Sequence, residues 1–283
     1  MRKGKCTVKW LGIVSGLLLL FLAASIFMSQ NFLSVMHYRY RNEKITVPFM
    51  VVQISDLHNH EFGKSNSRLV KKIAGEQPDA IFMTGDMLND EEGRTDVVEN
   101  LIRELREIAP VYFSFGNHEK VYEQRDTDFT QKLEDAGAIV LEKDYLDTQI
   151  GGQEVRIGGV YGYVLARDFG DGSEQRFMEE FEDTDRFKIL LSHIPEGLLL
   201  WKSMERWDVD LVFSGHVHGG QVRLPFAGGL FDPEEGYFPT YTKGEFACGY
   251  GIMILSAGLG SSGRIPRINN LPEVVVCRIG SDE

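Results

Sequence analysis

Cysteine is scarce in this chain, and its few cysteines form no recognisable site. Cys6, Cys248 and Cys277 are the three present, and their spacing matches no metal-binding pattern. Cys6 lies in the N-terminal tail, whereas Cys248 and Cys277 are expected to be two buried free thiols. A disulfide between these two in an oxidising compartment is the alternative. A metal site built on thiolates is therefore not expected.

Basic residues are also in deficit. Lys and Arg number 30 against 42 Asp and Glu, for a net charge of −12, which argues against a protein that binds nucleic acid through a basic face. The same charge disfavours a phosphate-bearing substrate unless bound cations reverse the local sign. With 43% hydrophobic and 25% charged residues and no internal repeat, the chain has the composition of one large globular domain.

Charge of either sign is absent from Trp10 to Met36, which includes the run "LGIVSGLLLLFLAASIFM". About 20 apolar residues cross a bilayer as a helix, so residues 10–30 are predicted to be a transmembrane signal anchor. Residues 31–46 would follow as a juxtamembrane linker, in which "HYRYR" has the aromatic and basic character of an interface anchor. A cleavable signal peptide is the alternative, because "LAAS" offers small residues.

Positive charge gathers before this apolar run. Residues 1–9 contain Arg2, Lys3, Lys5 and Lys9, whereas Arg39, Arg41 and Lys44 follow the run at a greater distance. By the positive-inside rule, residues 1–9 are expected to be a cytoplasmic tail. The chain is then a single-pass protein of the cell membrane, with its large domain outside the cytoplasm.

Buried strands alternate with amphipathic helices in the first half of this domain. Strands are predicted at "PFMVVQIS", "PDAIFMTGD" and "VYFSF", and helices over 66–76 and 95–108. The second half contains more strands, among them a pair joined by Gly151-Gly152, and a helix over 174–183. This pattern predicts an α/β fold in which two sheets pack together with helices outside.

Polar residues with metal-binding side chains follow several of these strands. They are Asp56, His58, Asp86, Asn117, His118, His193, His216 and His218. Five of the seven histidines belong to this set, which scattered surface histidines would not explain. In an extended segment residues i and i+2 point to the same side, so Asp56 with His58, and His216 with His218, are each expected to aim at one place. Ligands collect at this edge of α/β sheets.

These residues resemble the calcineurin-like metallophosphoesterases. The pattern of that family is D-x-H, G-D, G-N-H-[DE], H and G-H-x-H, and the chain has every part in this order over 47–279. The pieces "ISDLHNHEFG", "GHVHGGQVRLPFAGG" and "GLGSSGRIPRINNLPE" look like the membrane-associated bacterial branch. The resemblance implies a two-sheet αββα sandwich over 47–283, following one N-terminal transmembrane helix, and a site for two divalent metal ions.

The resemblance also implies how the ligands divide. One metal would be held by Asp56, His58, Asp86 and His218, and the other by Asp86, Asn117, His193 and His216. Two divalent ions outweigh the two aspartates, so the pocket would be cationic within an acidic protein. Oxygen and nitrogen ligands without thiolate suit Mn, Fe or Zn.

The resemblance implies that the chain is an enzyme that hydrolyses phosphoesters. The two ions would clamp a phosphoryl group and lower the pKa of a shared water, and His118 would stabilise the developing charge or protonate the leaving group. Many relatives carry a second acid that orients this histidine. Here Asn89 stands at that position and Asp90 comes one residue later. Asn89 can still accept a hydrogen bond from the imidazole, but it favours the imidazolium less than a carboxylate would.

Other residues near the motif have simpler interpretations. His60 is expected to be a loop residue and His37 to be interfacial. Glu119 is expected to face solvent or to hold a structural hydrogen bond. Gly258, Gly260 and Gly263 either bind phosphate through backbone N–H groups or form a plain turn.

The leading hypothesis is a membrane-anchored phosphodiesterase or pyrophosphohydrolase that acts on a lipid-linked phosphate ester and binds no nucleic acid. A nucleotide or phosphoprotein phosphomonoesterase is the alternative, and a non-catalytic metal-binding scaffold is less favoured because no motif residue is lost. The segment 223–241 is expected either to wall the metal site or to pack onto the domain. Its large apolar residues are Phe226, Leu230, Phe231, Tyr237, Phe238 and Tyr241.

Overall fold

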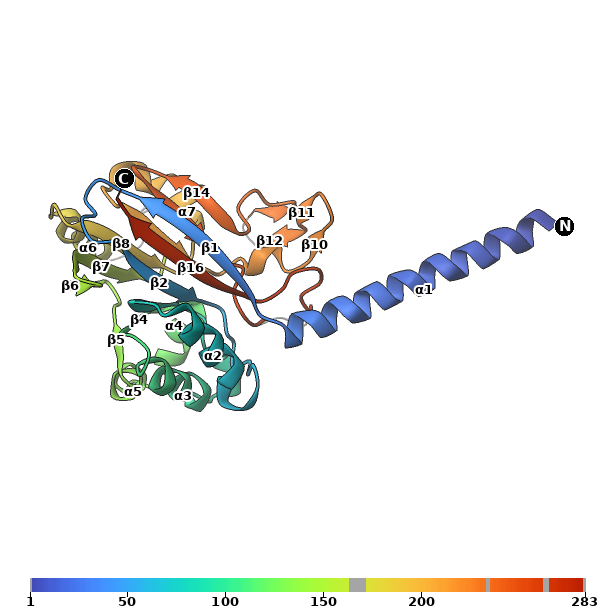
Figure 1. Ribbon diagram of the computed structural model, residues 1–283, viewed down its shortest axis with the longest axis horizontal. Coiled ribbons are helices and arrows are strands. Elements are labelled where there is room, and N and C mark those ends of the chain that lie inside the picture. Colours follow the sequence, from blue (N-terminus) through green and yellow to red (C-terminus); the bar gives the residue numbers. More distant parts are fainter. Residues whose placement is uncertain (1, 163–171, 233–234, 262–264, 282–283) are drawn as a thin grey trace.

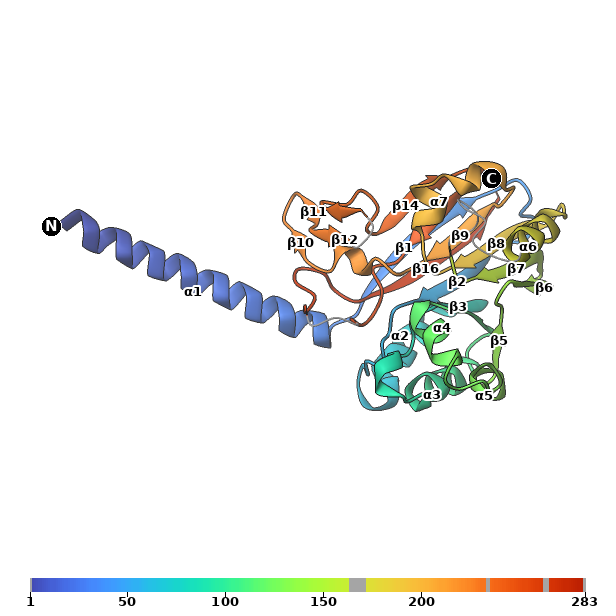
Figure 2. The same ribbon diagram turned by 180° about the vertical axis from the view of Figure 1, so that it is seen from behind.

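A long N-terminal helix, α1 (Arg2–Asn31), projects from a domain built on two facing sheets (Figure 1). The computed structural model describes residues 2–162, 172–232, 235–261 and 265–281. The view from behind (Figure 2) shows helices on the outer faces of both sheets. The α/β sandwich that the sequence predicts is therefore confirmed.

The first sheet consists of β1 (Ser34–Arg41), β2 (Phe49–Ile54), β3 (Ala80–Thr84), β4 (Val111–Ser114), β5 (Ala138–Val140) and β16 (Glu273–Gly280). Its strand order is β1-β16-β2-β3-β4-β5. The strands from β2 to β5 run parallel, while β16 pairs antiparallel with β2 and parallel with β1. Three neighbouring parallel strands, β2, β3 and β4, thus end at one edge.

The second sheet consists of β6 (Asp144–Ile150), β7 (Gln153–Val160), β8 (Phe187–Ser192), β9 (Leu211–Ser214), β14 (Gly244–Cys248) and β15 (Gly251–Leu255). Its order is β14-β15-β9-β8-β7-β6, with the central strands parallel and both edge strands antiparallel. The predicted hairpin joins β6 to β7, where Gly151 and Gly152 have φ of 58° and 90°. Positive φ at both turn residues is what a two-residue hairpin of this kind requires.

Helices cover the outer face of each sheet. The first sheet carries α2 (Ser67–Glu76), α3 (Asp96–Leu105), α4 (Asn117–Glu123) and α5 (Phe129–Ala136), and the second carries α6 (Ser173–Glu182) and α7 (Glu196–Leu199). Short 3₁₀ turns lie at η1 (Lys64–Asn66), η2 (Asp90–Glu92), η3 (Ser203–Arg206) and η4 (His218–Gly220). The predicted helices over 66–76, 95–108 and 174–183 correspond to α2, α3 and α6.

Three apolar cores hold these layers together. Alternate residues of a strand enter different cores: Val51 of β2 packs between the sheets, and Val52 packs beneath the helices of the first sheet. The third core lies between the second sheet and α6 and α7. Cys248 and Cys277 are buried in different cores as free thiols, which confirms that expectation, and burial raises the pKa of each to about 12.

The segment expected to be a linker, residues 31–46, contains strand β1. This strand pairs with β16 along its whole length, from Ser34 opposite Glu273 to Arg41 opposite Gly280. Tyr38 and Tyr40 pack against the core between the sheets, and the Tyr40 hydroxyl donates to the carbonyl of Asp210 at 2.9 Å. The linker expectation is therefore wrong for Ser34–Arg41, because this stretch pairs along its whole length as a strand of the first sheet.

Helix α1 is apolar and mostly uncovered. Its stretch Trp10–Asn31 is long and apolar enough to cross a membrane, as a signal sequence also is. Two of its serines, one turn apart, are buried against the domain. Ser29 Oγ donates to the Arg267 carbonyl at 3.0 Å, and Ser25 Oγ accepts from the Asn269 amide. The end of α1 is thus docked directly on the domain.

Between η4 and β14 the chain makes two small hairpins. They pair β10 (Arg223–Leu224) with β11 (Gly228–Gly229) and β12 (Phe231–Asp232) with β13 (Gly236–Tyr237). These strands lie at the end of the domain where α1 joins it (Figures 1 and 2). Four apolar side chains of this segment are largely exposed: Phe226, Phe231, Tyr237 and Phe238.

Candidate metal centre

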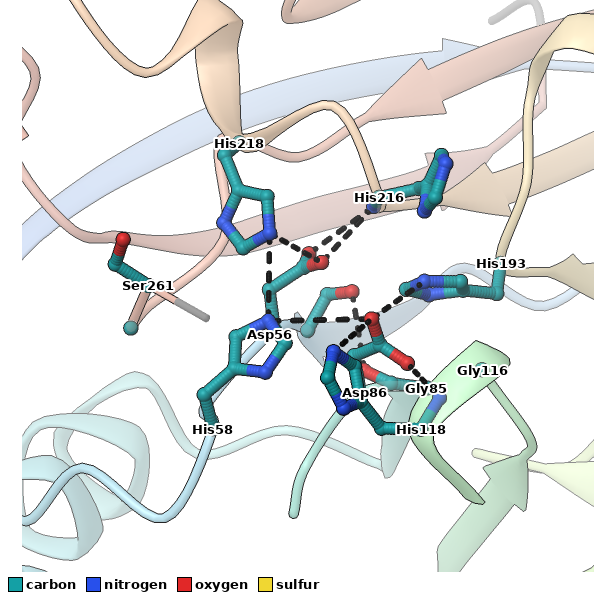
Figure 3. A network of polar contacts seen from close by, with 12 residues as sticks. Asp56, His58, Gly85, Asp86, Gly116, His118, His193, His216, His218 and Ser261 are labelled. Atoms are coloured by element: carbon teal, nitrogen blue, oxygen red, sulfur yellow. Dashed lines mark hydrogen bonds and ion pairs between the residues drawn. The ribbon is translucent and has the colours of Figure 1, made fainter. Parts of the chain in front are cut away.

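The predicted site residues all follow the carboxyl ends of central strands. Asp56 and His58 follow β2, Asp86 follows β3, and Asn117 and His118 open α4 just after β4. His193 follows β8, and His216 and His218 follow β9. Because both sheets end at this edge, residues far apart in sequence meet between them (Figure 3).

The backbone turns at the candidate ligands instead of staying extended. Five of them have positive φ: Asp56 (53°), His58 (49°), Asp86 (54°), His216 (76°) and His218 (48°). This conformation is uncommon for residues with a side chain, and such residues cluster at functional sites. Asp56 and His58 aim at one place as expected, whereas His216 and His218 enter different groups of candidate ligands, and the extended geometry used to predict both pairs is wrong.

A first group contains Asp56, His58 and His218, whose ligand atoms lie within 4.8 Å of one another. The Nε2 atoms of the two histidines are 3.3 Å apart, and His218 Nε2 lies 3.6 Å from Asp56 Oδ1. Gly215 makes room beside this group, because a Cβ there would meet Ser55 Oγ and lie 2.5 Å from Asp56 Oδ2. These three residues match three of the four expected for one metal.

A second group contains Asp86, His193 and His216, again within 4.8 Å. His193 Nδ1 lies 2.8 Å from the Thr84 carbonyl, and its Nε2 lies 3.2 Å from Asp86 Oδ2. A hydrogen bond from Nδ1 to a carbonyl aims the opposite ring nitrogen into the site, as is usual for metal-binding histidines. The structure therefore separates His216 from His218, one in each group.

Asp86 lies between the two groups. Its Oδ1 accepts the His118 amide at 2.9 Å, and its Oδ2 is 3.2 Å from His193 Nε2 and 3.9 Å from His58 Nε2. One carboxylate oxygen thus faces imidazoles of both groups. This is the position that a ligand shared by two ions requires.

Several buried polar atoms at the site have no hydrogen-bond partner. They include His58 Nδ1 and Asn117 Oδ1, and His193 Nε2 has only the Asp86 carboxylate, 3.2 Å away. Buried polar atoms are normally paired, and an unpaired one needs an explanation. Together with the oxygen and nitrogen donors of the two groups, these atoms fit a pair of divalent cations.

Electrostatics within the site are dominated by burial and mutual proximity. Burial lowers the pKa of His58 to about 3 and that of His216 to about 4, so both imidazoles are neutral at physiological pH, as metal ligands must be. Burial alone would lower the pKa of His193, but Asp86 outweighs it and raises that pKa to about 10. Against burial, the same histidine holds the pKa of Asp86 below its ordinary value.

His118 is oriented by a carboxylate after all. Its Nδ1 lies 2.5 Å from Asp90 Oδ1, and its Nε2 faces the site, 3.9 Å from Asp86 Oδ2. Asn89, which the motif places at this position, instead donates to Glu92 at 3.3 Å. The expectation that Asn89 supports His118 is therefore wrong, because η2 begins at Asp90 and presents that residue to the imidazole.

Glu119 holds the loop that carries Asp86. It is fully buried, and its carboxylate accepts the amides of Asp86 (2.7 Å), Met87 (2.8 Å), Leu88 (3.2 Å) and Gly116 (2.8 Å). Burial raises its pKa, which these bonds partly offset. Of the two roles expected for Glu119, the structural hydrogen bond is confirmed and the solvent-facing one is wrong.

A cleft of about 420 Å³ opens beside His58. Residues of α1 form part of its lining, together with His60 and the segment around Arg267: Ser29, Gln30, His58, Asn59, His60, Glu92, Leu259, Gly260, Ser261, Pro266 and Arg267. Arg267 is buried and donates to the Gly260 carbonyl at 2.7 Å. No sequence pattern predicts that Ser29 and Gln30 line this cleft, because only the docking of α1 on the domain brings them beside His58.

The aromatic residues of segment 223–241 do not belong to the described lining of this cleft. Tyr241 packs on Phe246 with ring centroids 5.0 Å apart, whereas Phe226, Phe231, Tyr237 and Phe238 are largely exposed. The expected apolar wall beside the metals is therefore wrong, and packing onto the domain accounts for Tyr241 but not for the four exposed residues.

The glycine-rich turn after β15 is packed tightly against the Asp56 loop. The amides of Leu259 and Gly260 donate to the carbonyls of Ser55 and Asp56, and a Cβ at Gly258 would lie 2.7 Å from the Asp56 side chain. These amides are not free for a phosphate, so the plain turn is confirmed for this part. Gly263 lies outside the described residues.

The two remaining histidines of the chain are not candidate ligands. His60 is a loop residue after β2, as expected, and its ring meets that of Phe62 edge to face. His37, on β1, is exposed and lies 2.9 Å from Glu76 Oε2 at the end of α2.

Comparison with known proteins gives a consistent result. A family model described as calcineurin-like phosphoesterase matches residues 49–220. The uncharacterized metallophosphoesterase YkuE of Bacillus subtilis is 28% identical over 240 residues, which cover 82% of this chain and 79% of that protein. Phosphodiesterase YaeI of Escherichia coli is 27% identical over 237 residues, covering 82% of each chain.

Among solved structures, a 5'-nucleotidase precursor from Thermus thermophilus aligns with a TM-score of 0.48 and 17% identity. The alignment covers 75% of this chain and 49% of that one. This chain therefore spans about half the length of the nucleotidase.

Proposed function

The chain belongs to the calcineurin-like phosphoesterase family and is a metal-dependent phosphoester hydrolase, and from this premise we propose that it is a membrane-anchored phosphodiesterase or pyrophosphohydrolase for a lipid-linked substrate. In this proposal α1 stays in the cell membrane as a single-pass anchor. The domain lies on the extracytoplasmic side.

One observation carries the lipid-linked substrate. The cleft beside His58 is lined by Ser29 and Gln30, which belong to the last turn of the helix that can cross a membrane. Because Ser29 and Gln30 lie within one helical turn of Asn31, the cleft opens within about 5 Å of the end of the span along the helix axis. A phosphate group carried by a membrane lipid would reach such a cleft without leaving the membrane surface.

The exposed side chains of the two small hairpins support the same arrangement. Phe226, Phe231, Tyr237 and Phe238 lie in the segment whose strands sit where α1 joins the domain (Figure 2). Aromatic residues are enriched at membrane–water interfaces, where their rings sit at the level of the lipid head groups. An enzyme held there meets lipid head groups at high effective concentration.

The metal centre would use both groups of ligands. We assign Asp56, His58, Asp86 and His218 to one ion and Asp86, Asn117, His193 and His216 to the other, with Mn, Fe or Zn as the candidate metals. Such ions, when bound, supply the positive charge that polarises a phosphoryl group and activates water. Their charge also resolves the conflict between an acidic protein and an anionic substrate.

Hydrolysis forms a bond between phosphorus and the oxygen of water and breaks the bond between phosphorus and the leaving oxygen, which must then gain a proton. In our proposal His118 holds this proton at Nε2 and donates it to the leaving oxygen, while Asp90 keeps Nδ1–H in place and stabilises the imidazolium. Glu119 contributes indirectly, because it fixes the backbone on both sides of Asp86.

The experiment compares substrates with the full chain, reconstituted with metal in lipid nanodiscs. We expect kcat/KM for a lipid-linked diester or pyrophosphate to exceed that for its water-soluble head group, and Asp86→Asn to abolish both activities. A chain that cleaves nucleotides or phosphoproteins better than any lipid-linked ester would refute the proposal, and would favour the phosphomonoesterase alternative.

A further inference from the structure

A second cavity, of about 380 Å³, lies between α1 and the domain, and no candidate metal ligand lines it. Helix α1 forms one wall with Phe21, Ala24 and Met28, strand β1 adds Met36, and two cations, Arg223 and Lys243, lie on the domain side. We propose that this cavity binds an anionic phospholipid of the membrane that α1 spans. The proposal rests on the membrane anchoring proposed above, but not on the identity of the substrate.

The apolar wall has the form that an acyl chain needs. Phe21, Ala24 and Met28 are spaced by three and four residues, so they share one face of α1. Phe21 precedes the helix end at Asn31 by ten residues, which is about 15 Å along the axis. The bilayer hydrocarbon core is about 30 Å thick. A chain lying on this face would therefore run from the domain into the apolar core of the membrane.

The polar wall has the charge that an anionic head group needs. Arg223 Nη1 donates to the Gly219 carbonyl at 2.7 Å and to Thr242 Oγ1 at 3.0 Å, which holds the guanidinium in place. Glu273 is a buried carboxylate that attracts Arg223 electrostatically and pairs with Lys243, whose Nζ lies 2.7 Å from Glu273 Oε2.

Arg223, Lys243 and Glu273 together carry one net positive charge. The lipid must supply one negative charge to balance it, which a phosphodiester head group without a compensating amine does. Phosphatidylglycerol has this charge, and phosphatidylcholine, with its quaternary amine, does not. The guanidinium also suits phosphate oxygens, because it presents several N–H donors in one plane. The cavity thus predicts selectivity between two lipids with identical chains.

The test measures lipid retention by the full metal-loaded chain with native mass spectrometry, using phosphatidylglycerol and phosphatidylcholine with the same chains. We expect about tenfold tighter binding of phosphatidylglycerol, equivalent to about 1.4 kcal/mol, and recovery of the lipid intact. The double variant Arg223→Gln/Lys243→Gln should remove this preference. Release of a hydrolysed lipid would overturn the proposal, since the lipid would then be a substrate of the metal centre.

A matched control removes the same charge elsewhere. Arg39 and Arg41 are exposed on the half of β1 farther from α1, so Arg39→Gln/Arg41→Gln should keep the preference for phosphatidylglycerol. Equal losses in the two double variants would mean diffuse electrostatic attraction, and would overturn the proposed site.

A second variant guards against misfolding of the first. Met36→Trp fills the apolar part while leaving both cations in place, and it should weaken phosphatidylglycerol binding with little change in the melting temperature. Unchanged binding would exclude the cavity. Apart from the check for hydrolysed lipid, these measurements read binding and not turnover, so a wrong assignment of the substrate would leave their outcome unaffected.

Discussion

Asp86 is the residue on which the metal centre depends most. Its Oδ2 faces histidines of both ligand groups, and its Oδ1 accepts the amide of His118. Removing this carboxylate leaves each group one donor short. It also removes a negative charge that would partly balance two buried metal cations.

We therefore expect Asp86→Ala to lose both metals and all activity together. Elemental analysis of the purified chain measures the metal content. Asp96→Ala, which removes an exposed acid of α3, should retain two ions per chain. Two ions per chain in Asp86→Ala would show that the shared-ligand assignment is wrong.

In the proposed mechanism Asp90 acts on the proton that His118 donates. With Asp90→Asn the imidazolium loses its carboxylate, so proton donation should become slower while metal binding stays intact. We expect Asp90→Asn to lower kcat by about tenfold or more. The loss should be smaller than that of His118→Ala, which removes the general acid itself and should lower kcat by roughly 10²–10⁴-fold. The loss should be largest for substrates with poor leaving groups, which need the proton most.

A series of aryl phosphodiesters of increasing leaving-group pKa measures this effect, as a steeper dependence of kcat on that pKa. Asn89→Ala is the matched control, because Asn89 contacts Glu92 rather than His118, and its slope should equal that of wild type. An unchanged slope in Asp90→Asn would remove Asp90 from the catalytic step.

Glu119 should matter for stability. Glu119→Ala would leave four backbone amides without their acceptor, and a single buried unsatisfied group costs about 1–3 kcal/mol. We expect the free energy of unfolding of the metal-free chain to fall by about 4 kcal/mol in chemical denaturation, the low end for four such amides. Glu123→Ala, at the partly exposed end of the same helix, should change it little. A loss of the same size in both variants would contradict the role of the Glu119 carboxylate.

At the scale of elements, the docking of α1 depends on Ser25 and Ser29. Each hydroxyl bonds the backbone of the segment that also carries Arg267. The double variant Ser25→Ala/Ser29→Ala keeps an apolar span, so it should still enter the membrane fraction. Losing a hydrogen bond of about 1 kcal/mol should speed amide exchange at Asn269 by roughly fivefold.

Hydrogen–deuterium exchange of the segment 265–271 in nanodiscs reports this change. Ser15→Ala alters a serine on the uncovered part of α1 and should leave exchange at Asn269 as in wild type. Unchanged exchange in the double variant would mean that these contacts do not hold α1 to the domain.

The paired β1 strand also places the domain relative to α1. Because β1 starts at Ser34, only Phe32 and Leu33 separate it from the end of α1. The connection from α1 to the first sheet is therefore short, in contrast to the linker expected over residues 31–46. The cleft beside His58 and the cavity beside Arg223 both lie against the last turns of α1 for this reason.

At the scale of the whole molecule, we expect the charges that flank the apolar span to set its orientation in the membrane. Arg2, Lys3, Lys5 and Lys9 precede the apolar span, whereas Arg39 and Arg41 belong to β1 and fold with the domain. Positively charged flanks stay in the cytoplasm, so protease added to intact spheroplasts should digest the domain. Protection until the membrane is broken would reverse the orientation and place the enzyme in the cytoplasm.

Much of the molecule can be deduced from local patterns in the sequence. Apolar runs and helical spacing predict the central strands and α2, α3 and α6, because burial imposes a period on neighbouring residues. The polar residues after those strands predict the metal site, because parallel strands bring their carboxyl ends to one edge. The length of the apolar run predicts a helix that can cross a membrane.

Other features arise only where distant segments meet. The pairing of Ser34–Arg41 with β16 depends on a partner that lies more than 200 residues later, and nothing in the composition of "HYRYR" announces it. Three other features depend in the same way on three-dimensional packing. Asp90 rather than Asn89 contacts His118, Glu119 binds four amides, and Ser29 lines the cleft. Sequence alone determined which chemical groups are present and which lie on one strand or helix face, and tertiary structure decided which of them touch, because hydrogen bonds and burial act between neighbours in space.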